Sequence, residues 1–251
     1  MSLLDQLSRP VIFAHRGVSS HAPENTLAAF QLALEHNADG IELDAKLSAD
    51  QQVVVIHDQS VDRTTGSTGV VRHLPLKVLK KLDVGQFFSP QFTGERIPTL
   101  DEVFQAIGDK LLINVELTNY MSTKDALPEK VAELVQKYAL ENCVLFSSFL
   151  PSNLTRIHDL LPDSPIALLA LPGIEGKLAR SSISRKISPN IIHPHHSDVT
   201  LRLKNREKAA GRRVHPWTVN SVTEMERLFE LQVDGIITDD PRLARQILEN
   251  Q

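Results

Sequence analysis

Three carboxylates in this sequence stand where they could share a metal ion. Glu42 and Asp44 are two residues apart in the apolar run GIELDA, and a strand there would point both side chains to one face. Glu116, in the run LLINVEL, would join them from the next strand of a parallel barrel. Carboxylates packed together repel, so they must take up protons or bind a cation. We expect one hard divalent cation, Mg²⁺ or Ca²⁺, at these three residues; a solvated strand face is the alternative.

Proton transfer and anion binding are the chemistry of a second group, His15, Arg16 and His57. VIFAH ends in His15, Arg16 follows at once, and His57 comes near the end of VVVIHD. Imidazole titrates near neutral pH and can give or take a proton at a phosphorus or carbonyl centre. Guanidinium binds phosphate bidentately and stays charged. We expect an acid/base pair and a phosphate-binding arginine; structural histidines and an ion pair from Arg16 to Glu24 or Asp44 are the alternatives.

These residues meet only if the chain brings the ends of its strands together. Strand-like apolar runs alternate with amphipathic helical patterns, which is typical of βα units around a parallel sheet. The eight runs are residues 11–15, 40–45, 111–117, 143–149, 165–171, 190–194, 213–219 and 235–239. Eight units in 251 residues, with no Gly-rich dinucleotide-binding turn, predict a TIM barrel rather than an open sheet. Its site should lie at the carboxyl ends of the strands, which Trp217 of the seventh run would also reach.

One stretch is too long for an ordinary connection between a strand and a helix. After the second run, the sequence predicts a turn and an extra strand that carries His57, and a helix resumes only at Thr99 or Leu100. We expect a single domain over residues 1–251, with residues 59–98 as a small cap inserted after the second strand. FFSPQF, residues 87–92, contains three phenylalanines, and we expect them to form a small apolar core within this cap.

Charge and composition indicate which kinds of partner and location to expect for this chain. The chain has 27 basic and 31 acidic residues, a net charge of −4, and its basic residues are scattered, so no nucleic-acid partner is expected. The single cysteine, Cys143, lies in an apolar run and is expected to be a buried, inert thiol. No signal-peptide pattern or bilayer-spanning segment is found, so we expect a cytoplasmic protein without a transmembrane segment. The sequence does not indicate an oligomeric state.

Several motifs, in order along nearly the whole chain, carry a family resemblance. HRGVSSHAPENTLAAF at residues 15–30 contains HRG with PENT. DGIELDAKLSADQQVVVIHDQSVDRTTGSTG at residues 39–69 contains an E-x-D strand and an HD followed by RTT. IPTLDEVF, NVEL, WTVN and DGIITDDP follow. HRG alone is unspecific, but the ordered set resembles the glycerophosphodiester phosphodiesterase family.

The resemblance implies a TIM barrel with a small insertion after the second strand. Such a protein would use a divalent cation to hydrolyse a small-molecule glycerophosphodiester to an alcohol and sn-glycerol 3-phosphate. A lysophospholipase D-type activity is also compatible with this resemblance. The phenylalanines of the cap would then form a lid for the apolar group of a lysophospholipid, rather than a core of the cap. Carried over by position, the family roles fall on His15 and His57 as acid/base pair, Arg16 as phosphate ligand, Glu42, Asp44 and Glu116 as metal ligands, and Trp217 as the aromatic residue that contacts the substrate alcohol. For the tryptophan, packing in the upper barrel layer is the alternative.

One position departs from the family pattern. The family commonly has a lysine two residues after the third-strand glutamate, and this chain has Thr118 there. A hydroxyl cannot replace that positive charge, so phosphate binding is expected to rest on Arg16, the cation and another positive group. The candidates are His193, His195 and His196 in IIHPHHSD, which otherwise predict a polar loop rather than a transition-metal site.

Two other classes of function are alternatives for the same fold. A barrel that binds phosphate esters without catalysis would also fit the missing lysine, although both histidines and all three acids are retained. A Schiff-base lyase would need a lysine inside the barrel. The only strand candidate is Lys46, which we expect on the face opposite Asp44.

Overall fold

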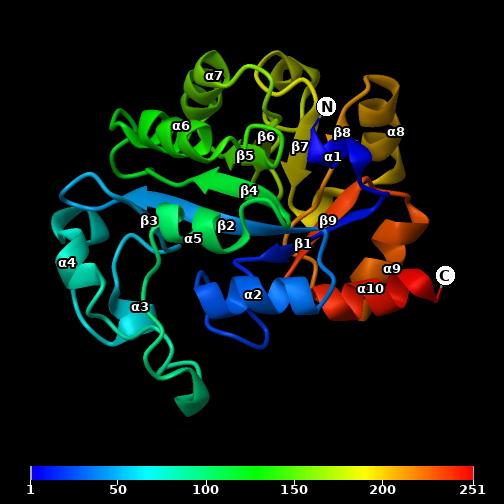
Figure 1. Cartoon of the computed structure of the whole chain (residues 1–251). Coiled ribbons are helices and arrows are strands. Elements are labelled where there is room, and N and C mark those ends of the chain that lie inside the picture. The colour runs from blue at the N-terminus through cyan, green and yellow to red at the C-terminus, as the bar shows by residue number, and fades with distance from the viewer. Residues whose placement is uncertain (1, 251) are drawn as a thin grey trace.

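Parallel strands curve around a common centre in the computed structural model, which describes residues 2–250 (Figure 1). The barrel strands are β1 (Val11–His15), β2 (Gly40–Leu47), β4 (Leu112–Leu117), β5 (Val144–Ser148), β6 (Ile166–Ala170), β7 (Ile191–Pro194), β8 (Arg213–Val214) and β9 (Gly235–Thr238). They pair in the order β8-β7-β6-β5-β4-β2-β1-β9. Each predicted run overlaps one of these strands, and the predicted TIM barrel is confirmed.

The seam between β8 and β9 is closed by an irregular segment. β8 ends at Val214, and Pro216 has no amide hydrogen to donate toward β9. Backbone hydrogen bonds still close the barrel: the amide of Val219 donates to the carbonyl of Ile237 at 2.9 Å, and the amide of Ile237 donates to the carbonyl of Pro216 at 2.9 Å. Trp217 therefore lies just beyond the seventh barrel strand rather than on it.

Helices cover the outside of the barrel (Figure 1). They are α2 (Leu27–Glu35), α5 (Leu100–Ile107), α6 (Leu127–Tyr138), α7 (Pro151–Leu160), α8 (Leu201–Ala209), α9 (Val222–Glu230) and α10 (Pro241–Glu249). Thr99 caps α5 at the predicted start and forms a capping box with Glu102. Cys143, predicted to be buried, is only half-buried at the edge of the main core. Among residues 2–250, no helix is long and apolar enough to cross a bilayer.

Alternate strand residues face the inside of the barrel and form a separate apolar cluster. Phe13, Leu112, Leu145 and Ile237 belong to it, and Leu4 of the short helix α1 (Leu3–Gln6) packs against them. These contacts lie toward the amino-terminal ends of the strands. The polar inward-facing residues therefore stand on an apolar floor at the opposite, carboxyl-terminal end.

The insertion after β2 begins with β3 (Val53–Val55), which pairs antiparallel with β2. Short elements follow: α3 (Asp62–Thr65), η1 (Val71–His73), α4 (Leu76–Leu79) and η2 (Pro90–Phe92), beside the barrel in Figure 1. The other 3-10 turns are η3 (Ser182–Lys186) and η4 (His196–Asp198). Two expectations were wrong here. His57 lies in the loop after β3, and Phe87 and Phe88 are 62% and 43% exposed, because aliphatic residues such as Val61 and Leu79 form the apolar cluster of the insertion.

Candidate functional site

The three predicted carboxylates form a cluster at the carboxyl ends of β2 and β4. Asp44 and Glu116 are register partners on the two strands, and Glu42 lies on the same face of β2. One oxygen from each of the three side chains lies within 4.8 Å of the others. Glu42 is 3% exposed and Asp44 is 1% exposed, which excludes the solvated strand face offered as the alternative.

The electrostatics of this cluster favour a cation. Burial, together with the charges of its carboxylate neighbours, raises the pKa of Glu42 well above its ordinary value. Burial and the charge of Asp44 raise the pKa of Glu116 to about 7. Burial would also raise the pKa of Asp44, but nearby positive charges, Arg16 first, lower it overall. Buried carboxylate oxygens that repel one another fit a hard divalent ion, which would relieve the repulsion.

Arg16 follows β1 in a left-handed conformation with φ 54°. Its guanidinium contacts Glu24 at 3.0 Å and Asp44 at 3.4 Å, so both ion pairs weighed from the sequence are present. Gly17 comes next with φ 79°, and a Cβ there would lie 2.6 Å from a side chain of α2. The turn that places Arg16 beside the carboxylates therefore requires glycine.

His15 ends β1 and points into the mouth of the barrel. Its Nδ1 lies 2.6 Å from Oδ1 of Asp239, and its Nε2 lies 4.0 Å from Oε2 of Glu42. Asn220 donates a hydrogen bond of 2.6 Å to the other oxygen of Asp239. An ionised carboxylate only accepts hydrogen bonds, so Nδ1 carries the proton and Nε2 is left as the basic atom facing the carboxylates.

A series of charged side chains connects His57 to Arg16 in the loop after β1. Its Nδ1 lies 2.7 Å from Asp58, whose other oxygen accepts a 2.7 Å hydrogen bond from Arg63. Arg63 also donates to both oxygens of Glu24 at 2.7 Å, and Glu24 contacts Arg16. The hydrogen bond from Arg63 lowers the pKa of Asp58 to about 2. The inserted segment and the loop after β1 are thereby held in one arrangement.

A cavity of about 90 Å³ lies between these groups. Six of the seven predicted site residues line it: His15, Arg16, Glu42, His57, Glu116 and Trp217. Asn114 and Ser147 also line it, and within residues 2–250 their buried side-chain polar atoms have no hydrogen-bond partner. The Trp217 ring stacks edge to face on Phe149 at 5.6 Å, and its Nε1 donates to the carbonyl of His193 at 2.9 Å. Trp217 is thus both packed and exposed to the cavity.

The model of the glycerophosphoryl diester phosphodiesterase family matches residues 15–243. That range contains the whole cavity and all seven predicted site residues. The chain belongs to this family. It is therefore a phosphodiester hydrolase, as the ordered motifs predicted.

Individual relatives and solved structures agree with this over the full length of the chain. A glycerophosphodiester phosphodiesterase of Caldanaerobacter subterraneus is 41% identical over 234 residues, covering 93% of this chain and 95% of the relative. A human lysophospholipase D is 31% identical over 275 residues, covering 94% of this chain and 85% of the relative. The structure of an Oleispira antarctica phosphodiesterase in complex with the product sn-glycerol-3-phosphate matches with a TM-score of 0.87 at 28% identity, covering 99% of this chain and 100% of that one.

Lys46 lies on the same side of β2 as the carboxylates, so its expected placement on the opposite face was wrong. Residues 42, 44 and 46 alternate with the outward-facing residues of the strand. Lys46 is 4% exposed, and its ammonium group donates to the Thr118 hydroxyl at 2.5 Å. Burial lowers its pKa, while Asp44 and Glu116 act to raise it. Membership of the phosphodiesterase family, rather than the direction of this side chain, excludes the Schiff-base lyase.

The three histidines considered as substitutes for the family lysine do not supply a free positive charge. Burial lowers the pKa of His193 to about 3, so this ring is neutral inside the barrel. Burial also lowers the pKa of His195. His196 is paired with Glu224 at 2.9 Å. Lys46 is the cation that lies beside Thr118.

Sequence reasoning missed the residues that hold the predicted ones in place. These are Asp58, Arg63 and Asp239, together with Tyr120, whose hydroxyl donates to Glu116 at 2.6 Å. The first three stand inside the family motifs HD, RTT and ITDDP. Those motifs therefore held a signal, but only the fold shows which partner each side chain contacts.

Proposed function

We propose that this enzyme hydrolyses glycerophosphodiesters to sn-glycerol 3-phosphate and an alcohol, with His15 and His57 as the acid/base pair. The observation that carries the proposal is the 90 Å³ cavity, which two histidines, an arginine and two carboxylates line together. The Oleispira antarctica relative was solved with sn-glycerol-3-phosphate as its product, which supports the same product here.

Glu42, Asp44 and Glu116 would hold one divalent cation, and their oxygen-only donor set suits Mg²⁺ or Ca²⁺. When bound, such an ion polarises a phosphoryl oxygen and lowers the pKa of a bound hydroxyl or water. Arg16, which lines the same cavity, would neutralise the remaining charge on the phosphoryl oxygens. Its contacts with Glu24 and Asp44 keep the guanidinium oriented before substrate arrives.

The two histidines would divide the proton transfers. One removes a proton from the attacking hydroxyl, and the other protonates the oxygen of the leaving alcohol. Asp239 fixes His15 through Nδ1, and Asp58 fixes His57 in the same way. In both rings Nε2 is therefore the atom that would exchange protons with substrate. Trp217 would contact the glycerol moiety from the wall of the cavity.

The test is release of sn-glycerol 3-phosphate from glycerophosphocholine and glycerophosphoethanolamine, with Mg²⁺, with Ca²⁺ and with EDTA. His15→Ala and His57→Ala should each lower turnover by roughly 10² to 10⁴. His21→Ala is the matched control, because His21 is an exposed histidine of the same loop that does not line the cavity. Near-normal turnover in both site variants would reject the acid/base assignment. No metal-dependent turnover with either substrate would favour a barrel that binds phosphate esters without catalysis.

A lysophospholipase D-type activity is a second candidate. Phe87 and Phe88 are exposed and line a 230 Å³ cavity with Glu24 and Arg63, next to the loop that carries Arg16. An acyl chain could lie on these two rings, and the human relative carries the name lysophospholipase D. The Phe87→Ser/Phe88→Ser double variant should then lose activity on lysophosphatidylethanolamine and keep activity on glycerophosphoethanolamine. Equal activity of variant and wild type on both substrates would remove this candidate.

A cytoplasmic location and the lack of a nucleic-acid partner belong to the same proposal. The net charge of −4 and the scattered basic residues support the second point. Cell fractionation tests the location. A gel-shift assay at low salt tests the absence of nucleic-acid binding, which a salt-sensitive shift would contradict.

A further inference from the structure

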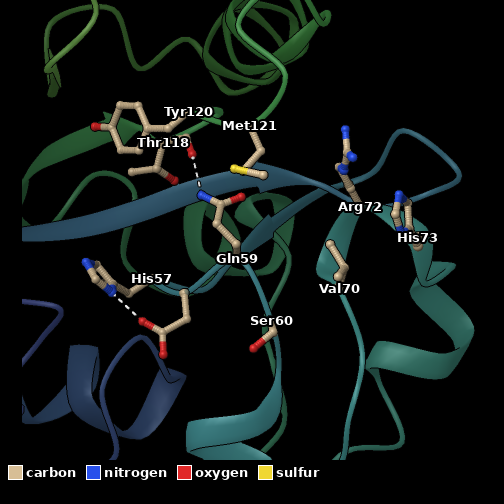
Figure 2. A pocket seen from close by; sticks show the side chains of 10 residues that line it. His57, Gln59, Ser60, Val70, Arg72, His73, Thr118, Tyr120 and Met121 are labelled. Carbon is tan, nitrogen blue, oxygen red and sulfur yellow. Dashed lines mark hydrogen bonds and ion pairs between the residues drawn. The ribbon is translucent and has the colours of Figure 1, made fainter.

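A second, larger cavity of about 500 Å³ lies between the inserted segment and the loop after β4 (Figure 2). His57, Arg72 and His73 line it from the insertion, and Thr118, Tyr120 and Met121 line it from the other side. His57 lines the 90 Å³ cavity as well, so the two cavities meet at one candidate catalytic histidine. A group bound in the larger cavity would lie next to the bond that is cleaved.

We infer that this cavity is the subsite for the leaving alcohol and that it favours alcohols bearing a carboxylate or phosphate. The inference rests on the proposed function, because it assigns the two halves of the same substrate to two places. The 90 Å³ cavity is small, and Arg16, Glu42 and Glu116, which the proposed function assigns to phosphate and cation binding, line it. The 500 Å³ cavity is in the range of ordinary small-molecule sites and has room for a larger alcohol.

The charges around the cavity set the preference. Asp58 is the carboxylate that lines it, and its oxygens already contact Nδ1 of His57 and the guanidinium of Arg63 at 2.7 Å each. Arg72 and His73 are exposed, and neither side chain makes a hydrogen bond or ion pair with any residue from 2 to 250. An anionic alcohol would gain charge-assisted hydrogen bonds here. A choline or ethanolamine group would meet no unpaired carboxylate.

Apart from Asp58, the described residues of the wall present no carboxylate to a cationic group. The amide nitrogen of Gln59 donates to the carbonyl of Thr118 at 3.2 Å, and the Tyr120 hydroxyl donates to Glu116. Figure 2 shows Arg72 and His73 on one side of the cavity and His57 on the other, with Met121 and Tyr120 above. Within residues 2–250, Arg72 is thus the cation of this wall that has no anionic partner, and it stands across the cavity from His57.

This placement also assigns the proton transfers. Water attacks phosphorus and gives a proton to Nε2 of His15, and a new P–O bond forms. The bond from phosphorus to the leaving oxygen breaks, its electron pair stays on that oxygen, and His57 supplies the proton that completes the alcohol. The sum is diester plus water to monoester plus alcohol.

The experiment compares glycerophosphoserine with glycerophosphoethanolamine, whose leaving alcohols differ by one carboxylate. Wild-type kcat/KM should be higher for the serine ester. Arg72→Ala should lower kcat/KM by about tenfold more for the serine ester than for the ethanolamine ester, and Arg72→Glu should reverse the preference. Lys77→Ala is the matched control, because Lys77 is an exposed cation of the cap that does not line the cavity.

Three outcomes separate the two claims. Selective loss on the serine ester supports the subsite. Equal loss on both esters, or no loss on either, overturns it while the proposed function stands. If the wild type releases sn-glycerol 3-phosphate from neither ester, the proposed function itself fails. Thermal melting of each variant checks that the fold is intact.

Discussion

Lys46 donates a 2.5 Å hydrogen bond to the hydroxyl of Thr118 across the pair β2 and β4. The same hydroxyl donates to the carbonyl of Ala45 at 2.8 Å, so Thr118 is fixed between two neighbouring groups of β2. A positive charge is therefore present next to position 118, but it comes from the adjacent strand. The charge of Lys46 also acts on Asp44 and Glu116, whose pKa values it helps to lower.

Removing this buried cation should impair catalysis. Lys46→Met keeps the apolar stem, removes the charge and leaves two buried carboxylates less compensated, so kcat/KM should fall by roughly 10- to 100-fold. A Lys46→Thr/Thr118→Lys double variant, which moves the ammonium to β4, should recover most of the loss. Lys204→Met is the control, because Lys204 is a buried lysine of α8 remote from the site. Unchanged kcat/KM in Lys46→Met would show that the charge plays no part in turnover.

Asp239 should act on the reaction only through His15. Asp239→Asn keeps the size of the side chain but gives up the charged acceptor for Nδ1, and kcat should fall by about 10- to 100-fold with little change in KM. The neighbouring Asp240→Asn is a close control, since asparagine caps a helix as well as aspartate does and Asp240 caps α10. An equal loss in both variants would indicate general disruption of this loop rather than positioning of His15.

Arg63 joins the two halves of the site, so its loss should affect both binding and turnover. Arg63→Ala releases Asp58 beside His57 and Glu24 beside Arg16, and we expect a lower kcat together with a higher KM. Arg63→Lys should stay impaired, because an ammonium group cannot bond both carboxylates in the planar geometry of guanidinium. Steady-state kinetics of the two variants, with Lys81→Ala as an exposed control in the cap, provides the measurement. Full activity in Arg63→Lys would contradict the claim that Arg63 must bond Asp58 and Glu24 at the same time.

The barrel and the carboxylate set were predictable because both follow from local periodicity. Apolar runs at regular spacing predicted the strands, and the two-residue separation of Glu42 and Asp44 placed them on one face. The same rule places Lys46 with them, so its expected placement on the opposite face was wrong. β8 covers only the first two residues of the run predicted at 213–219.

Contacts between distant segments were not predictable in this way. His15 and Asp239 are 224 residues apart, and Arg63 reaches Glu24 across 39 residues. No periodic pattern relates such positions, because the barrel brings them together only after all strands have paired. The prediction that Phe87 and Phe88 form the core of the insertion was wrong. Aliphatic residues fill that core and leave both rings exposed.

Cation binding should depend on pH through Glu116 and Glu42. In the metal-free protein the pKa of Glu116 is about 7, so below that pH a proton competes with the cation for this oxygen. Since both pKa values are raised by the fold, these groups contribute stability that is full below about pH 4.5 and is lost as pH rises through the folded pKa. A bound divalent ion should offset that loss.

The difference in Tm between protein with excess Mg²⁺ or Ca²⁺ and protein with EDTA should therefore grow from pH 5.5 to about pH 8. Buried His193 and His215, whose pKa values burial lowers, titrate alike in both samples, so their contribution cancels in the difference. Glu116→Gln removes one of the competing protons and should flatten the pH dependence as well as reduce the shift. A Tm difference that is constant across this range in the wild type would show that these carboxylates do not bind the cation.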